Sequence, residues 1–251
     1  MQILTLRLSV FGDYKRYIPT AQNSIQWTQA LQKAGYDFLP NMIQVQQPAS
    51  QGTPATTEKR MQFVSPSGDI CIRILAERVD VEFARGSSDH LDRYFADKFA
   101  MGTQIMSTML SALGDTKGRR LAYYVDAFIP EQEGKSLQTF YQDNNLGISL
   151  RNSCDECVEW NHRFNRRACF DVNGEGEVSN IIFTSESGVM QALHVATHER
   201  LAYRGMRITA DINTLAENED ERFGAAHAEG FYSQAHTLYL GVMQQLETKL
   251  P

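Results

Sequence analysis

Alternation of apolar and polar residues is the clearest pattern in the chain, and it predicts two groups of strands. The first group follows a turn at Pro66-Ser67-Gly68 and has two runs with an apolar residue at every second position. These runs are Ile70, Ile72 and Ile74, and then Val79, Val81 and Phe83. The second group has Met206, Ile208, Ala210 and Ile212. Such alternation is typical of antiparallel strands with one buried face. Residues 119–129, which are apolar almost throughout, are expected to form a central strand.

A short sequence match connects the two groups and predicts an internal duplication. The segments "FVSPSGDICIRILAER" from Phe63 and "FTSESGVMQALHVATHER" from Phe183 share Phe-x-Ser-x-Ser-Gly-x7-Ala at a constant offset of 120 residues. The identities alone are weak, because Ser and Gly are common in turns, but the strand pattern repeats with them. In the second segment we expect a turn at Ser187-Gly188 between strands over 178–183 and 189–195.

An apolar stripe of helical period follows each group of strands. The first helix is expected to begin near Asp89 and to end at Gly114, which can adopt the left-handed conformation of a C-terminal cap. The second is expected to begin with Asn218 as its cap, near Glu219, and to reach the last residues of the chain. The segment 41–59, rich in Pro, Gly, Thr, Ser and Gln, reads as an exposed loop or hairpin tip after a short strand.

These elements define an expected fold class. A one-sided sheet and a one-sided helix bury their apolar faces against each other. We therefore expect an α+β protein of two similar halves, residues 1–132 and 133–251, each an antiparallel β-meander packed against a long amphipathic helix. One continuous core joining the two halves is the alternative to two separate domains.

Composition narrows the class of protein. A chain of 251 residues with 42% hydrophobic and 10% aromatic residues can bury a sizeable core. Its formal net charge of −6 argues against sequence-independent binding to phosphate backbones, although a local basic patch is compatible with it. No apolar run approaches the roughly 18 residues of a membrane span, and "MQILTLRLSV" lacks the apolar core of a signal peptide. We expect a cytoplasmic protein with no membrane contact and with reduced cysteines.

The order of the segments resembles one known group of proteins. "MQFVSPSGDICIRILAERVDVEF", "GRRLAYYVDAFIP" and "ITADINTLAENEDERF" are similar to segments of a sporadically distributed bacterial family of uncharacterised proteins of similar length. In that family a strand reading roughly R-x-G-x-R-Y-x-N-x-I-x-I-P follows the first long helix. Here Arg120 to Pro130 takes its place, with Asp126 where Asn is usual. The sporadic distribution implies an accessory protein of a defence or toxin–antitoxin locus, and the resemblance supplies no catalytic residues.

Three of the four cysteines lie in the stretch "NSCDECVEWNHRFNRRACF". Cys154, Cys157 and His162 have the spacing of a zinc knuckle, but Cys169 follows too late and no glycine allows the tight turns that such a site needs. Alternation over 158–164 predicts a strand, which would hold the ligands apart. We therefore expect no metal and no cofactor here, with His162 as a half-buried polar residue. Zinc, or a redox pair of Cys154 and Cys157, is the alternative.

The same stretch contains the densest basic and aromatic group in the chain: Trp160, Arg163, Phe164, Arg166 and Arg167. Arginine and aromatic side chains are favoured at protein interfaces. They also stack on single-stranded nucleic acid and contact its phosphates. We predict that this group binds a protein partner, a second copy of the chain included, with nucleic acid binding and a merely solvated face as the alternatives.

No motif in the chain identifies a reaction. Gly-x-Ser-x-Gly, HExxH and dinucleotide-binding patterns do not occur, and "GDTKGRR" at 114–120 is expected to be a turn. His227 and His236 are nine residues apart, which is not the i, i+4 spacing of a helical metal pair. We expect a non-catalytic macromolecule-binding or accessory protein. The alternative is a metal-dependent hydrolase whose site is assembled from dispersed residues.

Overall fold

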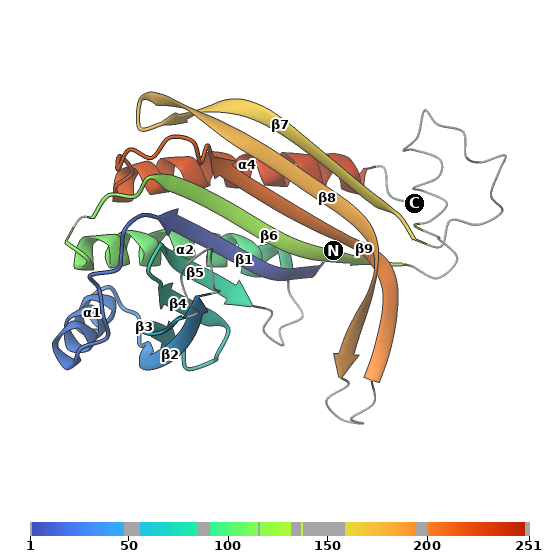
Figure 1. The fold of residues 1–251 in the computed structure, drawn as a ribbon. Helices are drawn as coiled ribbons and strands as arrows, with labels where there is room; N and C mark the ends of the chain where they lie inside the picture. Colours follow the sequence, from blue (N-terminus) through green and yellow to red (C-terminus); the bar gives the residue numbers. More distant parts are fainter. Residues whose placement is uncertain are drawn as a thin grey trace.

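The computed structural model describes residues 2–47, 56–84, 91–114, 116–131, 137, 159–193 and 200–248. Within these residues the strands form one sheet of nine, in the order β2-β3-β4-β5-β1-β6-β9-β8-β7, and every neighbouring pair is antiparallel (Figure 1). The strands are β1 (Gln2–Phe11), β2 (Leu39–Gln47), β3 (Thr56–Val64), β4 (Ile70–Ile74), β5 (Arg78–Ala84), β6 (Arg120–Pro130), β7 (Asn161–Val172), β8 (Glu175–Leu193) and β9 (Arg200–Thr214). The expected α+β class with an antiparallel sheet is confirmed.

Helices cover one face of this sheet. Helix α2 (Leu91–Ala112) packs on β1 and β5, and α4 (Ala225–Glu247) packs on β6 and β7 beside α2. Both lie behind the sheet in the view of Figure 1. The apolar members of the alternating strands point toward these helices, and they include the fully buried Leu8, Val81, Tyr123 and Ile212. The opposite face of the sheet carries the polar members of the same strands.

The strands and turn predicted for the first group are confirmed, whereas the predicted helix start near Asp89 lies outside the described residues. The turn at Pro66-Ser67-Gly68 joins β3 to β4, and Gly68 has a φ of 75°. Gly114, at a φ of 74°, follows α2 and leads into the connection to β6. The apolar strand expected over 119–129 is β6, which lies between β1 and β9 in the interior of the sheet.

The turn predicted at Ser187-Gly188 is wrong. Both residues lie inside β8, opposite Met206 and Gly205 of β9. Phe63 therefore lies on β3 and Phe183 on β8, at different positions of the sheet order. Ser and Gly favour turns only where no neighbouring strand pairs with them, and here the ladder to β9 continues past both residues. The division of the chain at residue 132 stays a prediction.

The predicted start of the second helix is also wrong. Helix α4 begins at Ala225 with Gly224 as its N-cap, six residues after the expected start. The side chain of Asn218 accepts a hydrogen bond of 3.1 Å from the N–H of Asp220, which forms a local turn instead of a helix cap. The N–H of Phe223 donates to the carbonyl of Gly118 at 2.8 Å and holds this segment against the chain entering β6.

Two elements near the start of the chain differ from expectation. Helix α1 (Ala21–Lys33), which the pattern analysis did not predict, begins after Thr20, whose side chain accepts a hydrogen bond from the N–H of Asn23 at 3.1 Å. The segment 41–59, expected to be an exposed loop or hairpin tip after a short strand, belongs largely to β2 and β3, which pair antiparallel and extend further than expected. Only residues 48–55 of that segment lie outside the described residues.

Candidate functional site: an arginine-rich edge of the sheet

The predicted binding residues lie on β7, at one edge of the sheet. The strand pairs with β8 along its whole length, from Asn161 opposite Glu186 to Val172 opposite Glu175. In the described part of the chain β8 is the sole neighbour of β7. The two strands are joined by Asn173 and Gly174, whose φ values of 58° and 86° are those of a tight two-residue hairpin. The outer edge of β7 can therefore offer backbone N–H and C=O groups to another strand, except at Asp171, whose N–H and C=O are hydrogen-bonded to the side chain of Gln234 on α4.

Pairing within the sheet sends the predicted residues to opposite faces. Phe164 stacks on Phe183 at 5.6 Å between ring centroids, on the side of the sheet that α4 covers. Arg166 is two residues after Phe164 on the strand, so its side chain lies on the same face of the sheet, the one that α4 covers. Arg163 and Arg167 lie opposite Thr184 and Asn180 and project to the face without helices. An occupant of the β7 edge would therefore meet arginines on both of its faces.

Trp160 has a different environment from the other members of the predicted group. It is buried, and its carbonyl accepts a hydrogen bond of 2.9 Å from the N–H of Ser187. This bond extends the pairing with β8 by one residue. Phe164, by contrast, is 40% exposed. The structure thus places Trp160 in the body of the protein and leaves Phe164 accessible at its edge.

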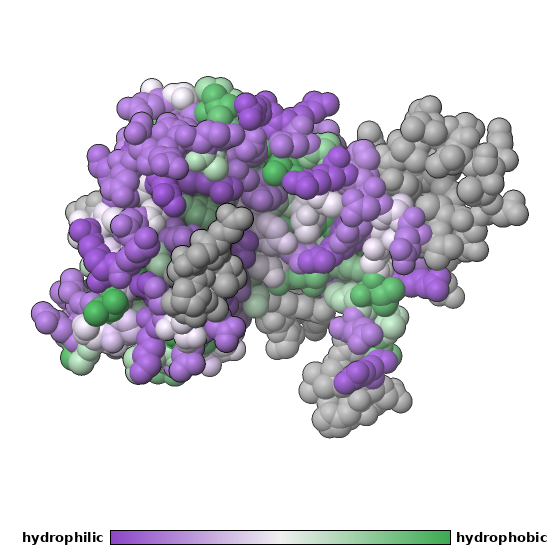
Figure 2. Space-filling view, viewed as in Figure 1, coloured by the Kyte–Doolittle hydropathy of each residue, from purple (hydrophilic) through white to green (hydrophobic). Residues whose placement is uncertain are grey.

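Most arginines on the face without helices are neutralised by carboxylates. Arg73 pairs with Glu82 at 3.1 Å, Arg78 with Asp80 at 2.9 Å, and Arg207 with Asp126 through two hydrogen bonds of 3.0 and 2.8 Å. The hydrogen bonds to Asp126 raise the pKa of Arg207 above its ordinary value. Figure 2, in the view of Figure 1, shows a mainly hydrophilic surface here.

The arginines of β7 are different. Arg163, Arg166 and Arg167 are all exposed, and no ion pair between described residues joins any of them to a carboxylate. Three unneutralised guanidinium groups within five residues create a local positive potential on a chain of net charge −6. This edge is the strongest candidate binding surface.

Zinc binding by Cys154, Cys157 and His162 is the alternative that the sequence leaves open for this stretch. Both cysteines lie outside the described residues. His162 is half-buried beside Phe164, with ring centroids 6.0 Å apart, and Cys169 is exposed further along β7. A search of the described residues finds no group of three or more His, Cys, Asp or Glu side chains that could hold a metal ion. The zinc, redox and hydrolase alternatives stay predictions.

A second group of polar side chains lies in the core between the sheet and the helices. Tyr123 Oη and His236 Nδ1 are hydrogen-bonded at 2.9 Å, and the His236 ring stacks on Phe99 of α2 at 3.9 Å between centroids. Burial lowers the pKa of His236 to about 4 and raises the pKa of Tyr123 well above its usual value. Both groups are uncharged at neutral pH. A general base that works near neutral pH needs a pKa close to neutrality, and the pKa of His236 lies well below that. We therefore assign Tyr123 and His236 to packing in the core.

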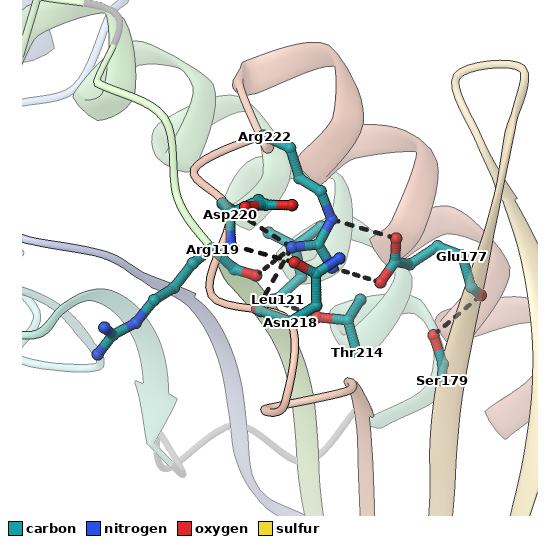
Figure 3. A network of polar contacts seen from close by, with 8 residues as sticks. All are labelled: Arg119, Leu121, Glu177, Ser179, Thr214, Asn218, Asp220 and Arg222. Atoms are coloured by element: carbon teal, nitrogen blue, oxygen red, sulfur yellow. Dashed lines mark hydrogen bonds and ion pairs between the residues drawn. The ribbon is translucent and has the colours of Figure 1, made fainter.

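A polar network around Arg222 fixes the segment that precedes α4 (Figure 3). Arg222 Nη2 donates to Glu177 Oε1 on β8 at 2.6 Å, and Nη1 donates to the carbonyls of Arg119 and Asp220 at 2.9 and 3.1 Å. One guanidinium thereby joins β8, the start of β6 and the turn before α4. Its donors are occupied by the protein's own groups, so we assign this network to structure.

Comparison with other proteins gives no match: no protein-family profile fits the chain, and neither a curated protein nor a solved structure is significantly similar to it. The described helices include none that is both long and apolar enough to cross a lipid bilayer.

Proposed function

We propose that this protein is a non-catalytic binding module that holds an extended, acidic segment of a partner protein along the outer edge of β7. The observation that carries the proposal is the coincidence of an edge strand of 12 residues with three exposed arginines that have no carboxylate partner among the described residues. Arg73, Arg78 and Arg207, on other strands of the same sheet face, are by contrast in ion pairs.

Strand addition explains why both features occur together. An extended segment added to a sheet edge gains main-chain hydrogen bonds, while its side chains alternate between the two faces. Arg163 and Arg167 would meet carboxylates on one face of the added strand, and Arg166 on the other. Arginine suits this role because its planar guanidinium can bind a carboxylate through two parallel hydrogen bonds.

The same charges oppose pairing between two β7 edges. Antiparallel pairing of β7 with its own copy would bring like-charged arginines together, and charged side chains are a common protection of exposed edge strands. The edge therefore favours a partner of opposite charge. The resemblance to sporadically distributed bacterial proteins supports an accessory role, such as that of a component of a defence or toxin–antitoxin locus.

We also propose that the chain consists of two related halves. In the first, β1 pairs with β5, the last strand of the meander β2 to β5, and α2 follows. In the second, β6 pairs with β9, the last strand of the meander β7 to β9, and α4 follows. The antiparallel pair β1 and β6 joins the halves. This equivalence relates β5 to β9 and supports a boundary between α2 and β6.

Fluorescence anisotropy with synthetic peptides tests the binding proposal. The probe is a labelled peptide in which two Glu residues alternate with two Val residues, so that carboxylates fall on both faces of an added strand, and a peptide of the same sequence N-methylated at every residue serves as a comparison. We expect the unmodified peptide to bind and the methylated one to bind much more weakly, because methylation removes the N–H groups that a sheet edge needs.

Charge-reversed variants supply the control. Arg163→Glu/Arg166→Glu/Arg167→Glu is expected to weaken peptide binding by about a hundredfold or more, since each lost charge pair becomes a repulsion. Lys15→Glu/Lys33→Glu/Lys117→Glu changes the net charge equally at exposed positions elsewhere and should leave binding intact. Equal loss in both triple variants, or tighter binding of a labelled single-stranded oligonucleotide than of the peptide, would reject the proposal.

A further inference from the structure

Strands β8 and β9 continue beyond the rest of the sheet as a two-stranded arm, residues 189–193 and 200–204 (Figure 1). Pairing of β9 with β6 ends at Gly205, and pairing of β8 with β7 ends at Glu186. Within the arm the two strands pair with each other, from Val189 opposite Arg204 to Leu193 opposite Arg200.

The arm exposes large apolar side chains. Val189 is 62% exposed, Leu201 37% and Tyr203 41%. Figure 2 shows apolar surface, in green, where the arm leaves the body of the protein. A two-stranded hairpin is marginally stable in water when no other element covers it, so an arm of this composition gains stability from a partner.

The charges of the arm indicate what kind of partner fits it. Arg200 and Arg204 are exposed, and the described part of the chain contains no ion pair that involves either of them. The other end of β9 leads into an acidic segment, residues 217–221, which contains Glu217, Glu219, Asp220 and Glu221, all exposed. These carboxylates likewise have no ion pair within the described residues.

The basic arm and the acidic segment cannot meet within one molecule. Ten residues of extended β9 separate Arg204 from Thr214, which at roughly 3.3 Å per residue corresponds to about 33 Å, and the turn that carries Glu217 follows. Two copies related by a two-fold axis remove this obstacle, because each copy can place its arm on the acidic segment of the other. Such an interface closes on itself and forms each contact twice.

We propose that the arm docks on residues 217–221 of a second copy of this chain, in a symmetric dimer. The arginines at positions 200 and 204 meet the partner's carboxylates, and the contact covers Val189, which lies opposite Arg204 on the same face of the arm; Leu201 and Tyr203 lie on its other face. This inference is independent of the β7 proposal, since it involves a different surface and an occupant that the chain itself supplies.

Sedimentation velocity over a range of protein concentrations tests the dimer, with charge reversal on either side of the contact. Arg200→Glu/Arg204→Glu and Glu217→Arg/Glu219→Arg are each expected to raise the dimer dissociation constant by about tenfold or more, since like charges then face each other. The variant that combines all four substitutions restores opposite charges and should return the dissociation constant to within about threefold of the wild type. Circular dichroism confirms that each variant is folded.

Lys15→Glu/Lys33→Glu is the matched control and should leave dimerisation unchanged. Arg163→Glu/Arg166→Glu/Arg167→Glu should also remain dimeric, which separates this inference from the fate of the β7 proposal. A monomeric wild type, failure of the fourfold variant to recover the dimer, or an oligonucleotide bound by the wild type but not by Arg200→Glu/Arg204→Glu would each overturn the inference.

Discussion

Tyr123 on β6 and His236 on α4 share a hydrogen bond of 2.9 Å at the junction of the sheet and its helices. The stack of His236 on Phe99 of α2 brings a third element to the same point. Because Tyr123 is buried, losing His236 would leave the Tyr123 hydroxyl without this hydrogen bond in an apolar environment. The pair therefore fixes the position of α4 against β6 and α2.

The buried histidine predicts acid sensitivity. The pKa of His236 is lowered to about 4 in the folded protein, against an ordinary value of 6.5. Between these pH values the unfolded chain binds a proton that the folded chain does not, so the free energy of unfolding decreases as the pH falls from about 6.5 to about 4, by up to about 3 kcal/mol. Urea unfolding of the wild type and of His236→Phe across this range measures the effect. Equal pH slopes for the two proteins would contradict it.

A glycine at the base of the arm predicts a steric effect. A Cβ at Gly205 would lie 2.6 Å from the ring of Phe128 and closer still to the carbonyl oxygen of Ile129, whereas the nearest atoms to a Cβ at Gly188 are 3.6 Å away. Gly205→Ala should lower the free energy of unfolding by at least about 2 kcal/mol, and Gly188→Ala by less than about 1 kcal/mol. Similar losses in chemical denaturation of both variants would show that the close approach is unimportant.

The Arg222 network predicts a local loss of order. Arg222→Ala removes the hydrogen bonds to Glu177 and to the carbonyl of Arg119, and it should destabilise the protein by about 1–3 kcal/mol. Hydrogen exchange should accelerate over residues 215–224 more than in the interior of the sheet. Arg166→Ala, at an exposed arginine without an ion pair among the described residues, is the control and should alter stability by less than about 0.5 kcal/mol.

Two apolar residues of helix α1, Trp27 and Ile25, should differ in how much they contribute to stability. Trp27 is 2% exposed and packs against Tyr17 at 6.3 Å between ring centroids, whereas Ile25 is 58% exposed. Trp27→Ala should lower stability by about 3–5 kcal/mol, and Ile25→Ala should have a small effect. If thermal unfolding showed comparable losses, α1 would not pack on the body as described.

Period-two patterning was enough to predict part of the sheet, because one face is buried and the other is polar. It predicted β4, β5 and the central part of β9 near their observed positions, and a nearly continuous apolar run predicted β6. At β8 the pair Ser187-Gly188 predicts a turn, whereas the strand continues through both residues. Local turn preference gives way there to pairing with β9, which a sequence does not display.

Two short-range signals in the sequence indicate elements that the hydrophobic pattern does not. Thr20 before the helix and Gly35 after it, the latter at a φ of 87°, are the usual caps of a helix such as α1. Asn173-Gly174 between alternating segments is the strongest short-range sign of a hairpin, and it joins β7 to β8.

The candidate site was predicted only as a group of residues. Alternation over 158–164 predicts the strand that carries Arg163, but the sequence does not show that Arg166 and Arg167 continue it, that this strand is an edge, or that carboxylates neutralise arginines elsewhere on the sheet face. The last two properties depend on contacts between distant segments, such as that of Arg207 with Asp126. The burial of Trp160 depends on them in the same way.

The position of β1 in the middle of the sheet has a consequence for folding. Leu6 lies opposite Phe83 on one side and Val125 on the other, so both ladders of β1 close loops of roughly 80 and 120 residues. The core of the sheet cannot form from local contacts alone, and entropy must be lost in closing these loops before the ladders contribute. We expect slow folding, with β1 exposed to chaperones or to wrong strand partners until β6 is available to cover it.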